Sequence, residues 1–138
     1  MVYKIDPNCK PDNRLRYLWH LTCHPDLGKN LETMRPRRTG KYRGDTEPKN
    51  TRFCCATNPG GSFTAIQMEA HRNYYLYRSV EKLKSYRPYE VFDSIATGER
   101  WLFEEAEFQL IKKFTSDEIK IIEGFVAVHG NLCKTTQT

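Results

Sequence analysis

The chain has 138 residues, of which 38% are hydrophobic, and a net charge of +5. A chain of this length can bury a core of its own, so it needs neither a disulfide nor a metal to fold. It has no run of about 18 apolar residues, which excludes a membrane-spanning helix, and the N-terminus lacks the apolar core of a signal peptide. We expect one domain over residues 1–138.

The cysteines are odd in number and are not spaced as metal ligands or as disulfide pairs. They are Cys9, Cys23, Cys54, Cys55 and Cys133. No Cys-x-x-Cys occurs, and neighbouring cysteines on a strand point to opposite faces. We therefore expect free thiols, no metal site and a cytoplasmic location, since a reducing compartment keeps thiols unpaired.

The positive charge is concentrated in the first part of the chain. Residues 1–52 hold 12 Lys and Arg against 6 Asp and Glu, whereas residues 53–138 hold 10 against 11. A basic surface attracts phosphates, on nucleic acids or nucleotides, and acidic protein surfaces. The first third is therefore the expected ligand-binding part.

The first elements follow from turn residues and apolar spacing. Residues 1–13 contain two prolines and are predicted to be irregular. Residues 15–22 alternate and are rich in aromatic side chains, which predicts a strand. Apolar residues at helical spacing predict a helix over 27–34, which Pro36 ends.

Residues 35–52 have no apolar period and are predicted to form a long basic loop. Such loops are uncommon in compact domains unless they bind or gate a ligand. The basic residues of this loop are Arg35, Arg37, Arg38, Lys41, Arg43, Lys49 and Arg52. Arginine binds phosphate through a planar fork of donors, and Tyr42 among them can stack on a ring.

The second part of the chain reads mostly as strands. A strand over 52–57 leads through a turn into a short helix, which Ser62 caps and which reaches Ala70. A strand over 74–79 and a helical turn over 80–86 follow. Further strands are predicted over 89–95, 99–104, 107–114 and 118–128. With helices early and strands late, the sequence predicts an α+β fold with two small mixed or antiparallel sheets.

Several residues on these elements carry candidate chemistry. His20 and Thr22 share one face of the first strand, where an imidazole and a hydroxyl can contact a sugar. The turn before Ser62 offers backbone amides to an anion. Glu99 and Glu107 each stand at the head of a strand, where a carboxylate can stabilise a developing positive charge. These features predict a phosphate-bearing ligand near the first strand.

Taken in order, the features resemble the ADP-ribosyltransferase-like fold. The resemblance is to the branch with poly-ADP-ribose polymerases, RNA 2′-phosphotransferases and DNA-modifying ADP-ribosyltransferase toxins. There an early strand ends in His-x-Thr, here His20-Leu21-Thr22. A helix, a loop, a strand leading into a second helix, and later strands bearing a glutamate then follow.

The resemblance implies NAD as the substrate and ADP-ribose transfer to a protein or nucleic-acid acceptor. His20 would bond the adenosine ribose, and Arg37 or Arg38 would hold the pyrophosphate. Glu99 or Glu107 would bond the nicotinamide ribose and favour an oxocarbenium-like transition state.

The resemblance assigns the residues that would bind the nicotinamide group of NAD less specifically than those for the ribose and the pyrophosphate. Leu21 stands where many relatives have glycine, and its backbone would hold the nicotinamide amide. Tyr42, Tyr74 and Tyr75 compete for the stacking position. Ser62, at the expected helix start, completes the implied binding set.

Two other functions stay open on the sequence alone. The chain also looks like a small phage-type protein, which would bind nucleic acid or block a nucleic-acid-binding complex without catalysis. That binding would use the loop cations Arg35, Arg37, Arg38, Lys41 and Arg43. The remaining alternative is a protein that only sequesters a nucleotide.

Overall fold

The described part of the chain contains mostly strands. The computed structural model describes residues 5, 7, 9–23, 28–38, 51–65, 72–89 and 98–129. The strands are β1 (Cys9–Pro11), β2 (Trp19–Thr22), β3 (Leu31–Met34), β4 (Arg37–Arg38), β5 (Thr51–Ala56), β6 (Tyr74–Ser79), β7 (Tyr86–Pro88), β8 (Glu99–Leu102) and β9 (Ala106–Phe114). The described helices are α1 (Pro59–Ala65) and α3 (Ser116–His129).

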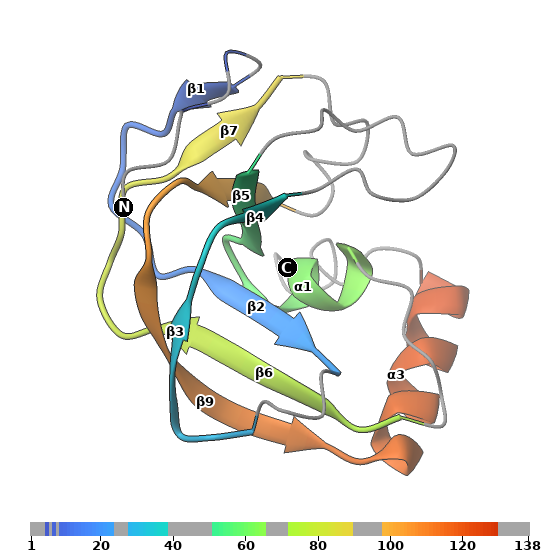
Figure 1. Cartoon of the computed structure of the whole chain (residues 1–138). Helices are drawn as coiled ribbons and strands as arrows, with labels where there is room; N and C mark the ends of the chain where they lie inside the picture. The colour runs from blue at the N-terminus through green and yellow to red at the C-terminus, as the bar shows by residue number, and fades with distance from the viewer. Residues whose placement is uncertain are drawn as a thin grey trace.

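Eight strands form one antiparallel sheet in the order β1-β7-β8-β5-β2-β6-β9-β3, and β4 pairs with β5 outside this path. Figure 1 shows β1 and β7 at one end of this sheet and α3 beside the far ends of β6 and β9. The fold is mainly β, so the predicted α+β fold with two sheets is wrong. Two segments were assigned to the wrong class, a strand that was predicted as a helix and a helix that was predicted as a strand.

The predicted helix over 27–34 is one of these segments. Residues 31–34 form β3, which pairs with β9 from Leu31 opposite Gln109 to Met34 opposite Ala106. Only Met34 is buried on this strand, and Leu31 is exposed. The helical spacing of these apolar residues therefore does not correspond to a buried helix face. Residues 24–27 lie outside the described part.

The predicted strand over 118–128 is the second segment, because it belongs to helix α3. The Thr115 hydroxyl accepts a hydrogen bond from the Glu118 amide at 3.3 Å, and the Glu118 carboxylate accepts one from the Thr115 amide at 3.2 Å. This reciprocal pair is a capping box, which starts a helix. Ile119 is fully buried against the sheet, so packing fixes the helix that the cap begins.

Three boundary predictions also fail in the described part. Helix α1 starts at Pro59, and Asn58 rather than Ser62 caps it, since its Oδ1 accepts from the Gly61 amide at 2.8 Å. Residues 80–86 hold no helical turn: Leu83 bridges to Arg16 instead. The basic loop is shorter at both ends, because β4 pairs with the start of β5. Residues 39–50, 66–71 and 90–97 lie outside the described part.

The predicted strands over 52–57, 74–79, 99–104 and 107–114 are confirmed as β5, β6, β8 and β9. The strand over 15–22 is confirmed for its second half, β2. All five segments are rich in aromatic or β-branched side chains, which suit a pleated and half-buried surface.

The sheet has a weak line between β2 and β5, which we call the seam. These strands pair at one position in the described residues, Trp19 opposite Ala56. By contrast, β2 pairs with β6 over four positions, and β5 pairs with β8 over four. In the described residues, the sheet therefore consists of two four-stranded halves whose backbones pair at one position.

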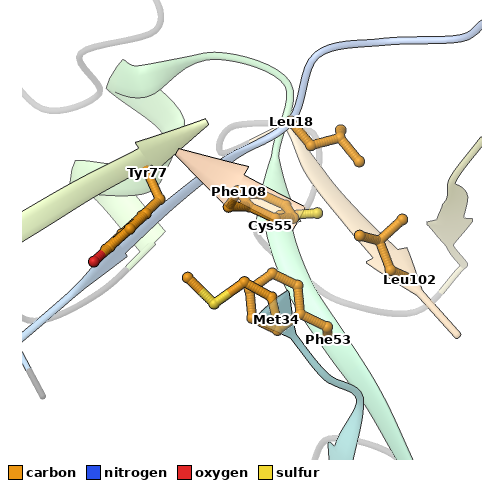
Figure 2. Packing of buried hydrophobic residues seen from close by; sticks show 7 residues of the cluster. All are labelled: Leu18, Met34, Phe53, Cys55, Tyr77, Leu102 and Phe108. Carbon is orange, nitrogen blue, oxygen red and sulfur yellow. The ribbon is translucent and has the colours of Figure 1, made fainter. Parts of the chain in front are cut away.

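The main core brings both halves together on one face of the sheet. It contains Leu18, Met34, Phe53, Cys55, Tyr77, Leu102 and Phe108, as Figure 2 shows. Phe53 packs edge-on against Phe108 with ring centroids 5.5 Å apart. These residues come from both sides of the seam, so apolar burial holds the two halves together where backbone pairing does not.

Tyr77 ties the chain before β3 to this core and gives a test of the fold. Its hydroxyl accepts a hydrogen bond from the Gly28 amide at 2.8 Å and donates one to the Lys29 carbonyl at 3.0 Å. Tyr77→Phe leaves both backbone groups without this partner, so we expect unfolding free energy to fall by about 1–3 kcal/mol in urea denaturation. Tyr89→Phe, at a side chain that is 59% exposed, is the control. Equal losses in the two variants would contradict the assignment.

Candidate functional site

The imidazole of His20 reaches across the seam. It is half-buried on β2, and its Nδ1 lies 3.1 Å from the Cys54 carbonyl of β5. A carbonyl only accepts, so Nδ1 donates and the orientation of the ring is fixed. The Phe53 ring lies 4.5 Å away, centroid to centroid. The predicted ribose-binding residue is therefore held at the line where the two halves of the sheet meet.

Glu99 lies at the same end of the seam. Ala56 is opposite Trp19 on one side and opposite Glu99 on the other. Two strand spacings separate β2 from β8, so the backbones of His20 and Glu99 are about 10 Å apart. The Thr57 amide donates to the Gly98 carbonyl at 3.1 Å and closes the corner before Glu99.

Gly98 is required at this corner. Its φ is +68°, a conformation that side-chain-bearing residues rarely adopt, and an added Cβ would collide with the Thr57 hydroxyl. Gly98 thus fixes where β8 begins, directly before Glu99.

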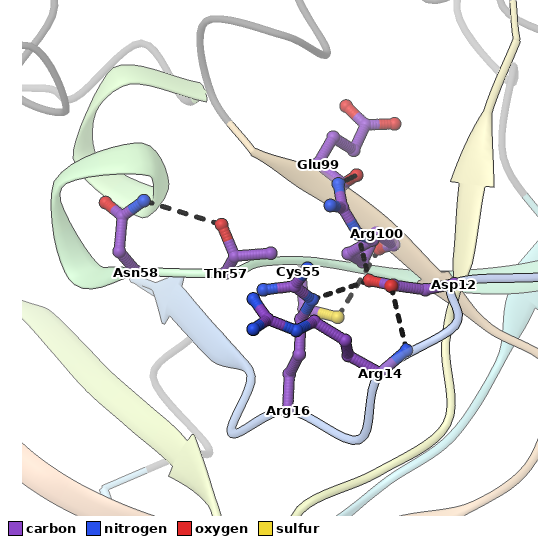
Figure 3. A network of polar contacts seen from close by, with 8 residues as sticks. All are labelled: Asp12, Arg14, Arg16, Cys55, Thr57, Asn58, Glu99 and Arg100. Carbon is purple, nitrogen blue, oxygen red and sulfur yellow. Dashed lines mark hydrogen bonds and ion pairs between the residues drawn. The ribbon is translucent and has the colours of Figure 1, made fainter.

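The two candidate side chains leave the sheet on opposite faces. Glu99 shares a face with Ala56 and Trp19, because paired residues point the same way, and His20 is the next residue after Trp19. Figure 3 shows Glu99 pointing away from the Asp12 carboxylate and its arginines. The structure therefore brings the backbones of His20 and Glu99 close together in the sheet, but their side chains lie on opposite faces.

The carboxylate of Glu99 is held by Trp101, which the sequence patterns did not single out. Glu99 is 9% exposed, and its Oε2 accepts a hydrogen bond from the Trp101 indole at 2.6 Å. The guanidinium of Arg52 lies 3.9 Å from the centroid of the Trp101 ring, and Arg52 is fully buried. Arg52, predicted as a loop cation, is thus part of the support behind Glu99. The spacing Glu99-x-Trp101 on one strand face was the available signal.

Ser62 lies in α1, the helix that directly follows β5. Its side chain is 4% exposed, and its hydroxyl has no hydrogen-bond partner among the described residues. A buried hydroxyl without a partner is costly unless a ligand or water completes it. Ser62 is therefore a candidate contact for a ligand, although it does not cap the helix.

Several of the other predicted site residues are buried in the fold. Leu21 and Tyr74 are 3% and 2% exposed and pack together against Ile119. Thr22 is also buried. Tyr75 is half-buried, and the Lys113 ammonium lies 5.7 Å from its ring centroid.

Glu107 is exposed on β9, and β6 separates β9 from β2. It lines a separate hollow of about 270 Å³ with Glu81 and Glu105. Glu99 is in the same row of the sheet as Trp19, next to His20, whereas Glu107 is three residues away from Leu110, which is in the row of His20.

The loop cations are only partly described. Arg35 pairs with Glu105 at 3.3 Å, and both side chains are largely exposed. Arg37 is exposed on β4, opposite Arg52 on β5. The side chain of Arg38 and all of Lys41, Tyr42 and Arg43 lie outside the described part.

Cys9, Cys23, Cys54 and Cys55 form no disulfide among the described residues, and Cys133 lies outside the described part. Burial raises the pKa of the Cys55 thiol well above its usual range, which makes it a poor nucleophile. Among the described residues, no three Cys, His, Asp or Glu side chains converge as metal ligands. No helix in the same part is long and apolar enough to cross a membrane.

Comparisons with models of protein families, with curated proteins and with solved structures found no match to this chain.

Asp12 organises the chain that leads into β2. Its Oδ2 accepts from Arg16 Nε at 2.6 Å and from Arg100 Nε at 2.8 Å, and its Oδ1 accepts from the Arg14 amide at 3.2 Å. Although burial raises it, these hydrogen bonds, from Arg100 first and then Arg16, lower the pKa of Asp12 to about 2. The carboxylate therefore stays ionised over the working range of pH (Figure 3).

This shift predicts a pH-dependent contribution to stability. A carboxyl whose pKa is lower when folded stabilises the fold above its unfolded pKa, and this contribution disappears as pH falls through the folded value. We expect Asp12→Asn to be less stable than the parent at neutral pH, with a gap that closes between about pH 5 and about pH 2. Urea unfolding at a series of pH values measures it, with Glu104→Gln at an exposed site as the control. A gap independent of pH would contradict the assignment.

Proposed function

We propose that this protein binds NAD or a related nucleotide at the seam and transfers ADP-ribose to a protein or nucleic-acid acceptor. One observation carries the proposal: Ala56 lies opposite both Trp19 and Glu99. The His-x-Thr strand and the glutamate strand therefore flank β5, the strand that leads into α1. These are the elements on which the resemblance to ADP-ribosyltransferases rests.

His20 is proposed to bind the adenosine ribose. Its Nδ1 is fixed on the Cys54 carbonyl, so the ring presents its other nitrogen in one direction. A contact to a ribose exists in both the bound substrate and the transition state, so it contributes to binding rather than to rate.

Glu99 is proposed to stabilise the positive charge that develops on the nicotinamide ribose. The bond between C1′ and the nicotinamide nitrogen breaks, and nicotinamide leaves with the bonding electrons. A nucleophilic atom of the acceptor bonds to C1′ and releases its proton to solvent. A buried carboxylate that Trp101 already orients acts on this cation without reorganising.

The opposite faces of His20 and Glu99 place a condition on the binding mode. A nucleotide that contacts both must cross the seam, where the described residues of β2 and β5 pair only at Trp19 and Ala56. The buried hydroxyl of Ser62, on the helix after β5, is the proposed third contact.

A non-catalytic function is the second candidate, either binding nucleic acid or sequestering a nucleotide. Exposed cationic side chains favour this function, because they are accessible to a nucleic acid or nucleotide. Arg37 is exposed, whereas Arg52 is buried behind Glu99. The two classes differ in one property, because only the transferase releases nicotinamide from NAD.

The test compares Glu99→Gln and His20→Ala with Glu104→Gln at an exposed control site. Nicotinamide release and mass-shifted products measure turnover, and calorimetry measures NAD binding. Glutamine keeps the size but removes the charge, so we expect turnover by Glu99→Gln to fall by roughly 100- to 1000-fold with binding retained. His20→Ala should mainly weaken binding.

One result would count against Glu99 as the catalytic residue, and another would count against the transferase itself. Turnover that survives in Glu99→Gln but is lost in Glu107→Gln would move the catalytic role to β9. No NAD binding by the parent protein, together with salt-sensitive binding to nucleic acid, would favour the non-catalytic function.

A further inference from the structure

A basic cavity lies at the opposite edge of the sheet from β3. It has a volume of about 440 Å³. It is lined by Lys10, Pro11, Asp12, Asn13, Arg14, Arg16 and Arg87. Four of these seven side chains are cationic and one is anionic. Of the four cations only Lys10 lies in residues 1–13, which were predicted to be irregular, and none belongs to the loop predicted to bind phosphate.

The register of the sheet holds two of the cations together. Lys10 on β1 is directly opposite Arg87 on β7, so the two side chains leave the same face of neighbouring strands. Like charges directly opposite each other destabilise an antiparallel pair. An anion bound between Lys10 and Arg87 would replace this repulsion by attraction to both side chains.

The carboxylate in the cavity does not neutralise this pair. Asp12 is 5% exposed and bonds Arg16 at 2.6 Å and Arg100 at 2.8 Å. Arg16 and Arg100 thereby have a counter-charge. Among the described residues, Lys10, Arg14 and Arg87 form no ion pair.

The three cations without a counter-charge are also accessible. The side chains of Lys10, Arg14 and Arg87 are all exposed. The backbone around them is fixed, because Asp12 accepts from the Arg14 amide and the Asp12 amide donates to the Ser85 carbonyl at 2.8 Å. The cavity thus offers three positive charges on an anchored backbone, from Lys10 on β1, Arg87 on β7 and Arg14 in the turn after β1.

We propose that this cavity binds the phosphate backbone of a nucleic-acid strand. Sites for small organic ligands are mostly apolar, whereas this one is lined mainly by charged and polar side chains. Its volume exceeds what one phosphate ion fills, which fits successive phosphates of a chain. Tyr89, two residues after Arg87 and 59% exposed, offers a ring on which a base can stack.

This site is separate from the proposed NAD site at the seam and does not depend on it. If both hold, the strand bound here would be the acceptor for ADP-ribose. Cavity variants should then lose nucleic-acid binding while still hydrolysing NAD with water as the acceptor, so the two proposals fail in different assays.

The experiment measures the fluorescence anisotropy of a labelled single-stranded oligonucleotide across a salt series. The full chain is compared with Lys10→Ala/Arg87→Ala and with Lys113→Ala/Lys120→Ala. The control pair is exposed on β9 and α3 and changes the net charge by the same amount. We expect the cavity variant to bind more than tenfold more weakly and to lose about 0.7 in the slope of log K against log salt for each phosphate contact removed.

Thermal unfolding checks that the variants are folded. Removing the opposed like charges should leave the melting temperature unchanged or higher, and Arg14→Ala, in the turn after β1, is a second variant with the same expected loss of affinity. An equal loss in the control pair, or no loss in either cavity variant, would overturn the proposal. Competition by inorganic phosphate at concentrations equal to the oligonucleotide phosphate would also overturn it, because the ligand would then be a small anion.

Discussion

The described residues of β2 and β5 pair at one position, Trp19 opposite Ala56, so few backbone hydrogen bonds join the two halves of the sheet. Each of these strands pairs over four positions with another strand, β2 with β6 and β5 with β8. The halves are otherwise joined by the buried side chains of the main core. Packing of this kind tolerates no gaps, so it fixes the relative position of β2 and β5 without the hydrogen bonds of a continuous ladder. A polar side chain at the seam can therefore bond the neighbouring strand's backbone, as His20 does with Cys54.

The arginines of the first third of the chain have three different roles. Arg52 is fully buried and lies over the Trp101 ring behind Glu99. Arg16 shares the Asp12 carboxylate with Arg100 and anchors the turn before β2. Arg14 is exposed at the basic cavity and has no described counter-charge. Net charge alone could not separate these roles, because burial and ion pairing depend on which segments meet in the fold.

Local patterns predicted the strands whose own residues favour a sheet, such as β6 and β9. They failed where a distant partner decides the structure: Leu31–Met34 is a strand because β9 pairs with it. The start of α3 was available in the sequence, since Thr115 and Glu118 have capping-box spacing, but its apolar residues suggested a strand. The position of Glu99 at a strand head was predicted, yet its face was not, because the face follows from register with Ala56. The pairing of Lys10 with Arg87 joins segments 77 residues apart, and no local pattern predicts it.

The most direct test of the proposed site follows backbone amide NMR signals of the full chain during titration with NAD. A nucleotide at the seam should shift the amides of Trp19 to Thr22 on β2, of Ala56 to Ser62 at the end of β5 and the start of α1, and of Gly98 and Glu99 on β8. The amides of β1 and β7 should stay in place in the same titration. Shifts confined to β1 and β7, or no shifts at saturating NAD, would contradict the assignment of the seam as the nucleotide site.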